Sequence, residues 1–232
     1  MKKLVVLTGS GISAESGLST FRDSGGLWEG FDINDVASID GWYRDPEKVL
    51  EFYNQRRKNA LKAKPNNGHK VLAELEKYFS MTILTQNVDN LHEQAGSGNI
   101  IHLHGELFKS RSTGDESLIY DITGWELKKG DNCEKGYQLR PHIVWFGESV
   151  PLMKLAIQMT ISAEIFLVVG TSLVVYPAAG LLDYVQHYVP VYIVDPVIPR
   201  KLSRPDVHYF EEKASTGMNK VRDELLARYP ME

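Results

Sequence analysis

Short runs rich in apolar and β-branched residues recur along the chain and alternate with stretches of helical periodicity. These runs are Leu4–Leu7, Met81–Leu84, Ile100–Leu103, Ile143–Phe146, Ile165–Val169 and Val191–Val194. Strands of a parallel sheet have this pattern because helices cover both faces of the sheet. The alternation of such runs with helices therefore predicts an α/β fold with a doubly wound parallel sheet.

Two stretches interrupt the alternation. Asp45–Lys64 predicts one long helix, with Asp45 as the N-cap and Pro46 at the first helical position. Residues 109–139 are polar and rich in turn-forming residues. We expect both stretches to be insertions that form a smaller domain or lid. This divides the chain into a sheet domain of residues 1–31, 76–108 and 140–232, and a small domain of residues 32–75 and 109–139.

Composition narrows the class of protein. Among the 232 residues, 43% are hydrophobic and 24% are charged, with a net charge of −4, as expected for a soluble globular protein without a nucleic-acid partner. The one cysteine, Cys133, excludes an intrachain disulfide and a multi-cysteine metal site. We find no signal peptide and no segment long enough to span a membrane, so we expect a cytoplasmic protein without a membrane partner. The sequence leaves the oligomeric state open.

The first apolar run leads directly into a glycine-rich turn, G-x-G-x-x-A at residues 9–14. In a dinucleotide-binding turn Gly9 permits the tight bend, Gly11 lets the backbone approach a pyrophosphate, and Ala14 allows close helix packing. The following helix N-terminus would favour phosphate groups. A turn without a ligand is the alternative. Asp195, which ends another predicted strand, is a candidate partner for a ribose.

The turn also opens a longer run, Thr8–Arg22 followed by Gly25–Trp28, which closely resembles the signature of the sirtuin family. Further blocks match the family in the expected order: Thr85–Asp89 with Leu91 and His92, Leu103–Gly105, Arg140 and Pro141 through Glu148, and Gly170–Leu173 with Pro177–Ala179. Any one block could match by chance, but blocks in order over most of the chain are specific. The resemblance implies a Rossmann-like domain with a smaller inserted domain and a substrate cleft between them.

The resemblance also implies the reaction, an NAD-dependent removal of acyl groups from lysine side chains. Nicotinamide leaves NAD, the acyl carbonyl oxygen attacks C1′ of the ribose, and a histidine acts as base on a ribose hydroxyl. The products are nicotinamide, free lysine and O-acyl-ADP-ribose. NAD is the implied cofactor, and proteins or peptides with acylated lysine are the implied partners.

His104 follows a predicted strand, at the end where doubly wound sheets bind ligands, and an imidazole there can act as a general base. By the family pattern His104 is the catalytic base and Asn87 also belongs to the reacting pocket, whereas His102 is expected to be structural. The resemblance implies cofactor-binding roles for Gly9, Ser10, Gly11, Ile12, Ala14, Phe21, Arg22, Trp28, Gln86, Asn87, Val88, Asp89, Gly170, Thr171, Ser172, Asp195 and Ala214.

The substrate site has two expected parts. In sirtuins the segment corresponding to Val144, Phe146, Gly147 and Glu148 pairs its backbone with the substrate peptide as an added strand. The second part, the acyl pocket, is expected to contain Tyr53 and Arg56, described next.

The predicted long helix carries an apolar stripe that leads to Arg56. A charge in line with an apolar face either reaches solvent, pairs with a distant acid, or serves a ligand. Tyr53-x-x-Arg56 matches the sirtuin subgroup that removes succinyl and malonyl groups, and Ser24 would leave room for them. We expect desuccinylation with weaker deacetylation. The alternatives are a plain deacetylase, a mono-ADP-ribosyltransferase, or an NAD- or ADP-ribose-binding protein without deacylase activity.

The chain departs from most sirtuins at the structural zinc. Two Cys-x-x-Cys pairs usually hold the metal, but the corresponding residues here are Ser112, Asp115, Cys133 and Gly136. Because one thiol cannot make a tetrahedral cysteine site, we expect no metal. Apolar contacts must then hold residues 109–139, and the candidates for them are Leu118, Ile119 and Trp125.

Overall fold

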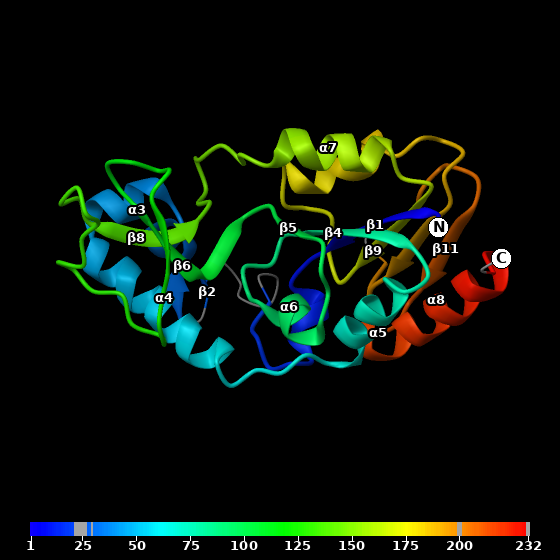
Figure 1. Cartoon of the computed structure of the whole chain (residues 1–232), viewed down its shortest axis with the longest axis horizontal. Helices are drawn as coiled ribbons and strands as arrows, with labels where there is room; N and C mark the ends of the chain where they lie inside the picture. The colour runs from blue at the N-terminus through cyan, green and yellow to red at the C-terminus, as the bar shows by residue number, and fades with distance from the viewer. Residues whose placement is uncertain (21–26, 29, 199–200, 231–232) are drawn as a thin grey trace.

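A six-stranded parallel sheet forms the centre of the larger domain (Figure 1). The computed structural model describes residues 1–20, 27–28, 30–198 and 201–230. The strand order is β11–β10–β9–β1–β4–β5. These strands are β1 (Lys3–Thr8), β4 (Ser80–Thr85), β5 (Ile100–His102), β9 (Ile165–Val169), β10 (Val191–Val194) and β11 (Val207–Phe210). The predicted α/β fold with a parallel sheet is confirmed.

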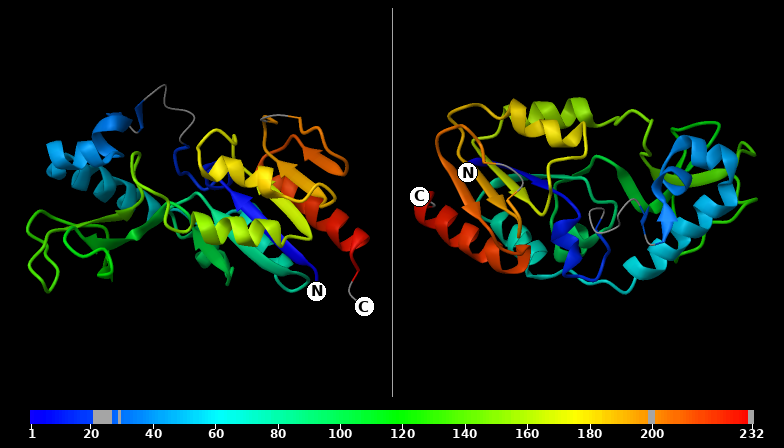
Figure 2. Two further views of the ribbon diagram at one scale, coloured as in Figure 1. Left: turned by 90° about the horizontal axis from the view of Figure 1, so that it is seen from above. Right: turned by 180° about the vertical axis from the view of Figure 1, so that it is seen from behind.

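Helices cover both faces of this sheet, as Figures 1 and 2 show. On one face lie α5 (Asn67–Leu75) and α8 (Ala214–Arg228), and on the other lie α7 (Met153–Ile161) and the 3₁₀ helix η2 (Ala178–Tyr184). Two shorter helices, α1 (Gly11–Ala14) and α6 (Leu91–Ala95), follow β1 and β4. Strand β1 joins both cores because its side chains alternate: Leu4 and Val6 lie in one core, and Val5 and Leu7 in the other.

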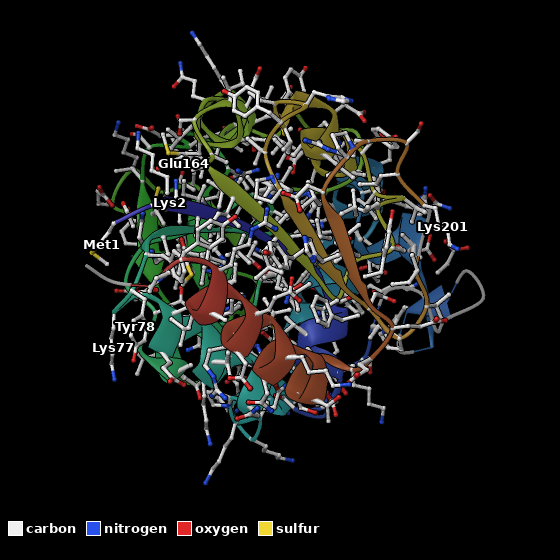
Figure 3. The ribbon with its side chains drawn as sticks, turned by 90° about the vertical axis from the view of Figure 1, so that its right-hand side faces the viewer. Met1, Lys2, Lys77, Tyr78, Glu164 and Lys201 are labelled. Atoms are coloured by element: carbon white, nitrogen blue, oxygen red, sulfur yellow. The ribbon has the colours of Figure 1, made fainter. Side chains whose placement is uncertain are left out.

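The amino terminus lies at the amino ends of the parallel strands, opposite the end at which the glycine-rich turn lies. Figure 3 looks at this end of the molecule, with α8 lying across the sheet. Lys2 pairs with Glu164 at 3.1 Å, and the backbone N–H of Lys3 donates to the same carboxylate. These contacts tie β1 to the segment that precedes β9.

The smaller domain contains an antiparallel sheet in the order β7–β6–β8, formed by β6 (Gly105–Ser112), β7 (Ile119–Asp121) and β8 (Leu139–Ile143). A two-stranded ribbon, β2 (Leu27–Trp28) with β3 (Phe31–Asp32), and the helices α2 (Ile33–Val36), α3 (Ile39–Arg44) and α4 (Pro46–Ala60) complete it. The predicted start of α4 is confirmed, since the Asp45 carboxylate accepts from the Lys48 N–H at 3.0 Å and Pro46 is the first helical residue. The helix ends at Ala60, before the expected Lys64.

Two expectations about the elements are wrong, and one strand was not expected. Ile143 ends a strand of the small antiparallel sheet, so Ile143–Phe146 is not a strand of the parallel sheet. Strand β11 was not expected at all; its residues are only partly buried at the sheet edge. Helix α5 was placed in the insert, but Val71, Leu72 and Leu75 are buried in the core of the parallel sheet.

Leu127, which was not among the expected residues, anchors the polar insert, and of the expected residues Leu118 and Trp125 are half-buried. Leu127 is only 4% exposed and packs into the small-domain core, whereas Ile119 is 44% exposed. Asn54 of α4 fixes Leu127, donating to its carbonyl at 3.1 Å and accepting from its N–H at 2.9 Å. Arg57, which is fully buried, donates to the carbonyls of Trp125 and Leu107. Within the described part of the chain, no helix is long and apolar enough to cross a membrane.

Candidate active site

A cavity of about 850 Å³ lies between the carboxyl ends of the parallel strands and the small domain. Most of the residues expected in the site line it: Gly9, Ser10, Gly11, Ala14, Tyr53, Arg56, Gln86, Asn87, Val88, Asp89, His104, Val144, Phe146, Gly147, Glu148, Gly170, Thr171, Ser172 and Asp195. Residues from both domains thus meet in one space, as expected where a doubly wound sheet binds a ligand.

The structure places the remaining expected residues elsewhere or does not describe them. Ile12 and Ala214 are buried in the core of the parallel sheet and do not line the cavity. Lys213, next to Ala214, does line it. Phe21, Arg22 and Ser24 lie outside the described residues, as does the side chain of Trp28.

The glycine-rich turn packs backbone against backbone on the loop that follows β9. The Gly11 N–H donates to the Gly170 carbonyl at 2.8 Å, and a Cβ at position 11 would lie 2.7 Å from that oxygen. Gly170 has φ +62°, and a Cβ there would lie 2.3 Å from the Ile12 nitrogen. The approach of the backbone to a pyrophosphate is one reason why position 11 requires glycine, and this close contact between the two loops is a second reason. The helix after the turn, α1, is a single turn long.

His104 is held in the tautomer that a general base needs. Its Nδ1 lies 3.1 Å from the Gln86 carbonyl, which can only accept, so Nδ1 carries the hydrogen and Nε2 keeps its lone pair. Burial lowers the pKa of His104, although the Gln86 carbonyl opposes this effect. Gly105 has φ +85° where the chain crosses His142, and a Cβ there would lie 2.0 Å from the His142 oxygen. A neutral imidazole at this place can take a proton from a ligand hydroxyl.

Ser13 is the hub of the polar wall beside His104. Its hydroxyl donates to the Asp89 carboxylate at 3.0 Å and accepts from the Asn87 side-chain amide at 3.2 Å. Asp89 also accepts from the Leu91 N–H at 3.1 Å. Burial raises the pKa of Asp89 against these two hydrogen bonds. No role was assigned to Ser13 from the sequence; its signal was a hydroxyl within the glycine-rich turn.

Two buried histidines extend this network beneath the cavity. His69 lies 3.5 Å from the Ser13 hydroxyl, and the two imidazole rings of His69 and His92 contact edge to face at 5.0 Å. His92 lies 3.0 Å from the Thr8 hydroxyl, which donates to Thr85 at 2.8 Å. Burial lowers the pKa of His69 to about 4 and that of His92 to about 3. Both rings are therefore neutral supports of the wall.

The far end of the cavity fits a nucleotide. Gln86 donates from its side chain to the Thr171 hydroxyl at 3.1 Å, joining the loops after β4 and β9. Asp195, 4% exposed at the end of β10, accepts from the Val197 N–H at 2.9 Å and still lines the cavity. The main-chain groups of the glycine-rich turn suit phosphates, and the hydroxyls and the one carboxylate suit ribose hydroxyls.

The small domain contributes a hydroxyl and a cation to the same cavity. The hydroxyl of Tyr53, which is 1% exposed, accepts from the Trp145 indole N–H at 2.9 Å. Burial raises the pKa of Tyr53 to about 12, so the hydroxyl keeps its proton. The guanidinium of Arg56 lies over the Phe52 ring at 5.6 Å. Both side chains line the cavity that also contains His104.

The expected peptide-binding segment forms a turn held by an ion cluster. The Glu148 carboxylate pairs with Arg140 at 2.7 Å and with Arg111 at 3.0 Å, and it accepts from the Trp145 N–H at 2.8 Å. Burial raises the pKa of Glu148, but these contacts outweigh it and the pKa is lowered. The side chain of Glu148 therefore shapes the turn. Arg111 and Arg140 had no predicted role.

The sequence of the chain matches the Sir2 family over residues 9–177. The chain belongs to the Sir2 family. It is 51% identical to an NAD-dependent protein deacylase of Bacteroides thetaiotaomicron over 97% of this chain and 99% of the relative. It is 49% identical to an NAD-dependent protein deacylase of Helicobacter pylori, with 97% and 96% covered.

Solved structures of Sir2 homologues have the same fold as this Sir2 chain. The crystal structure of a Sir2 homologue with NAD gives a TM-score of 0.85 at 37% identity, covering 98% of this chain and 91% of the other. The structure of a mutant Sir2 homologue in complex with ADP-ribose gives a TM-score of 0.88 at 35% identity, and the match covers 100% of this chain and 94% of the other. The fold and the arrangement of the cavity agree with the expected Rossmann-like domain and its insert.

Proposed function

We propose that this NAD-dependent protein deacylase removes negatively charged acyl groups, such as succinyl and malonyl, from lysine in preference to acetyl. The observation that supports this is the presence of Tyr53 and Arg56 in the same cavity as His104. A guanidinium offers a fork of donors that matches a carboxylate. An acetyl group has no charge to place against it.

The hydroxyl of Tyr53 is prepared to assist Arg56. The Trp145 indole nitrogen can only donate, so it occupies a lone pair of the Tyr53 oxygen and leaves the phenolic hydrogen for another acceptor. Because its pKa is about 12, this hydroxyl donates at every physiological pH. A carboxylate at the end of an acyl chain is an acceptor of the required kind.

The chain's own groups also account for the proton transfer. Bound NAD supplies the bond between nicotinamide and ribose that is broken in the reaction. Nε2 of His104 is the atom that accepts a proton from a ribose hydroxyl, since Nδ1 is committed to the Gln86 carbonyl. Asn87 and Asp89, joined through Ser13, present a rigid polar wall on the same side of the cavity.

The test removes the positive charge of Arg56 but keeps a long side chain at this position. Arg56→Met should lower kcat/KM for a succinyl-lysine peptide roughly 10- to 100-fold, the loss of a charged hydrogen-bonded pair, and change that for an acetyl-lysine peptide little. Arg44→Met, at an exposed position at the end of α3, is the matched control and should affect neither substrate. Equal desuccinylation by the parent and Arg56→Met would reject the proposed preference.

We also propose that the small domain folds without zinc. The Cys133 thiol donates to the Ser112 hydroxyl at 3.3 Å, and the same oxygen accepts the N–H groups of Gly114 and Asp115. Asp115 is paired with Lys135 at 2.7 Å. One thiol, one hydroxyl and one paired carboxylate do not match the donor set of a structural zinc site. Elemental analysis after extensive dialysis should find less than one zinc per ten chains, and stoichiometric zinc would contradict the proposal.

A further inference from the structure

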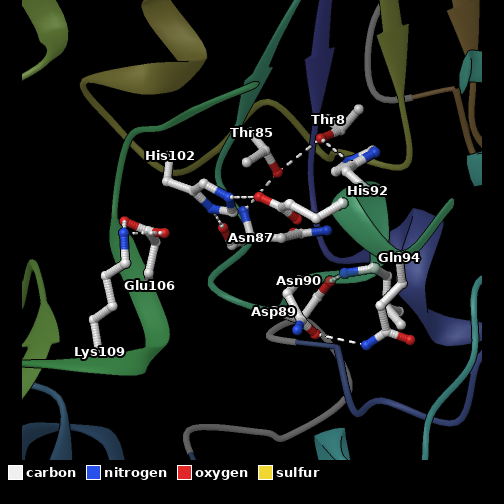
Figure 4. Close-up of polar contacts among 12 residues, drawn as sticks. Thr8, Thr85, Asn87, Asp89, Asn90, His92, Gln94, His102, Glu106 and Lys109 are labelled. Atoms are coloured by element: carbon white, nitrogen blue, oxygen red, sulfur yellow. Dashed lines mark hydrogen bonds and ion pairs between the residues drawn. The ribbon is translucent and has the colours of Figure 1, made fainter. Parts of the chain in front are cut away.

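His102 makes two hydrogen bonds that require both of its ring nitrogens to carry hydrogen. Nδ1 lies 3.0 Å from the Asn87 carbonyl oxygen, and Nε2 lies 2.7 Å from the Glu93 carboxylate on α6. Figure 4 shows the imidazole beside Asn87. Both partner atoms are acceptors only, and a neutral imidazole has one N–H. Both hydrogen bonds can therefore form together only when His102 is an imidazolium.

Its surroundings favour that charge. The His102 side chain is 9% exposed. Acidic groups face it from three further directions: Asp89 from the loop after β4, Glu106 from β6, and Asp121 from β7 across a small cavity of about 180 Å³. One cation opposes the charge, Lys109 of β6, and it pairs with Glu106 at 3.0 Å; His92 of α6, whose pKa is lowered to about 3, is neutral and does not oppose it.

The balance of these effects has a definite sign. Burial alone would lower the pKa of His102, but the Glu93 carboxylate, the Asn87 carbonyl and Glu106 together raise it. Burial would likewise raise the pKa of Glu93, but His102 lowers it. Two residues further on, burial lowers the pKa of His104. The pKa values of two nearby histidines are thus shifted in opposite directions.

The contact with His102 completes the fixation of Asn87. Thr85 accepts from the Asn87 N–H at 3.0 Å, Ser13 accepts from its side-chain amide at 3.2 Å, and His102 donates to its carbonyl. Because a trans peptide is planar, a fixed carbonyl oxygen also directs the N–H of Val88 away from His102. Both Asn87 and Val88 line the main cavity.

We propose that His102, kept cationic by Glu93, is a positioning residue that fixes the Asn87–Val88 peptide in the wall of the NAD cavity. Deprotonation of His102 leaves one N–H for two acceptors, so one of its two hydrogen bonds is lost and this peptide is held less firmly. The alkaline limit of NAD turnover is then set by His102, and the acid limit by His104. The inference concerns NAD and does not depend on the preferred acyl group.

The first test is the pH dependence of kcat/KM for NAD in the parent and in Glu93→Gln. Gln keeps an acceptor oxygen for Nε2–H but removes the charge, so the alkaline limb should move to lower pH by about one unit. At a pH above that limb KM for NAD should rise, whereas KM for the acyl peptide should stay the same. Glu106→Gln removes a nearby charge without a hydrogen bond to His102, and its shift should be clearly smaller.

The second test reads the proton directly. In ¹⁵N-histidine NMR spectra, His102 is assigned by the signal lost in His102→Gln, and both its nitrogens should show protonated shifts at neutral pH. A neutral His102 at neutral pH would overturn the proposal, as would an alkaline limb that is the same in Glu93→Gln and the parent. Because Glu93 is 40% exposed, its replacement does not open the core.

Discussion

His69 and His92 couple the acid stability of the molecule to the wall of its cavity. Both are fully buried, and their pKa values are lowered to about 4 and about 3, well below the value near 6.5 of an unfolded histidine. The unfolded chain therefore binds more protons than the folded chain once the pH is below about 6.5. The stability that the neutral rings provide is fully present above that pH and is lost as the pH falls towards their folded pKa values.

We predict that the free energy of unfolding falls by about 1.4 kcal/mol per pH unit for each of these histidines between roughly pH 6 and pH 4.5. His92→Gln should remove one of the two contributions and reduce the slope accordingly. His187→Gln, at an exposed position, serves as the control and should leave the slope unchanged. Urea unfolding at a series of pH values measures how the free energy of unfolding changes with pH. If this dependence is the same in His92→Gln and the parent, the result would count against a neutral buried His92.

At the scale of single residues, the sequence identified the groups that line the cavity better than the groups that hold them. His104, Asn87, Asp89 and Asp195 were singled out because they follow strands, and all of them line the cavity. The sequence did not single out Ser13, Arg57 or Trp145, because these residues contact atoms of residues that are distant in the sequence. No local pattern records such a contact.

At the scale of elements, the turn at residues 144–148 and helix α4 form one unit through Trp145. The Trp145 ring contacts Arg140 on one side at 3.4 Å, and its N–H donates to Tyr53. Glu148 fixes the start of the same turn through the Trp145 N–H. The turn therefore sets the direction in which the Tyr53 hydroxyl can donate.

Trp145→Phe retains an aromatic ring but removes the donor to Tyr53. We predict a roughly 2- to 10-fold loss of kcat/KM for a succinyl-lysine peptide, the value of one neutral hydrogen bond, with little effect on an acetyl-lysine peptide. In a double-mutant cycle, Trp145→Phe should have almost no further effect in the Tyr53→Phe background. Fully additive losses would show that Trp145 does not act through Tyr53.

The same scale shows what periodicity can and cannot decide. Strands β1, β4, β9 and β10 were predicted from their apolar runs because both of their faces are buried. The run Ile143–Phe146 has equal apolar character, yet only Ile143 is in a strand, and that strand belongs to the small sheet. Helix α5 was misplaced because its amphipathic pattern does not say which core it joins.

At the scale of the whole molecule, the two domains supply different halves of one reaction site. The parallel sheet provides the glycine-rich turn, the Asn87–Asp89 wall and the proposed base His104, whereas the small domain provides Tyr53 and Arg56. The insert keeps its position through hydrogen bonds from α4 to Leu127 and Trp125. The proposed function places an acyl-lysine between the domains, with its acyl end towards Tyr53 and Arg56 of α4.

A competition experiment tests this account most directly. The protein is given NAD and equal amounts of a succinyl-lysine and an acetyl-lysine peptide, and the products are followed by mass spectrometry in the parent and in His104→Ala. The account predicts nicotinamide and O-succinyl-ADP-ribose as the main products of the parent and loss of O-succinyl-ADP-ribose in His104→Ala. Preferential release of the acetyl group, or ADP-ribose attached to the protein in place of O-acyl-ADP-ribose, would contradict it.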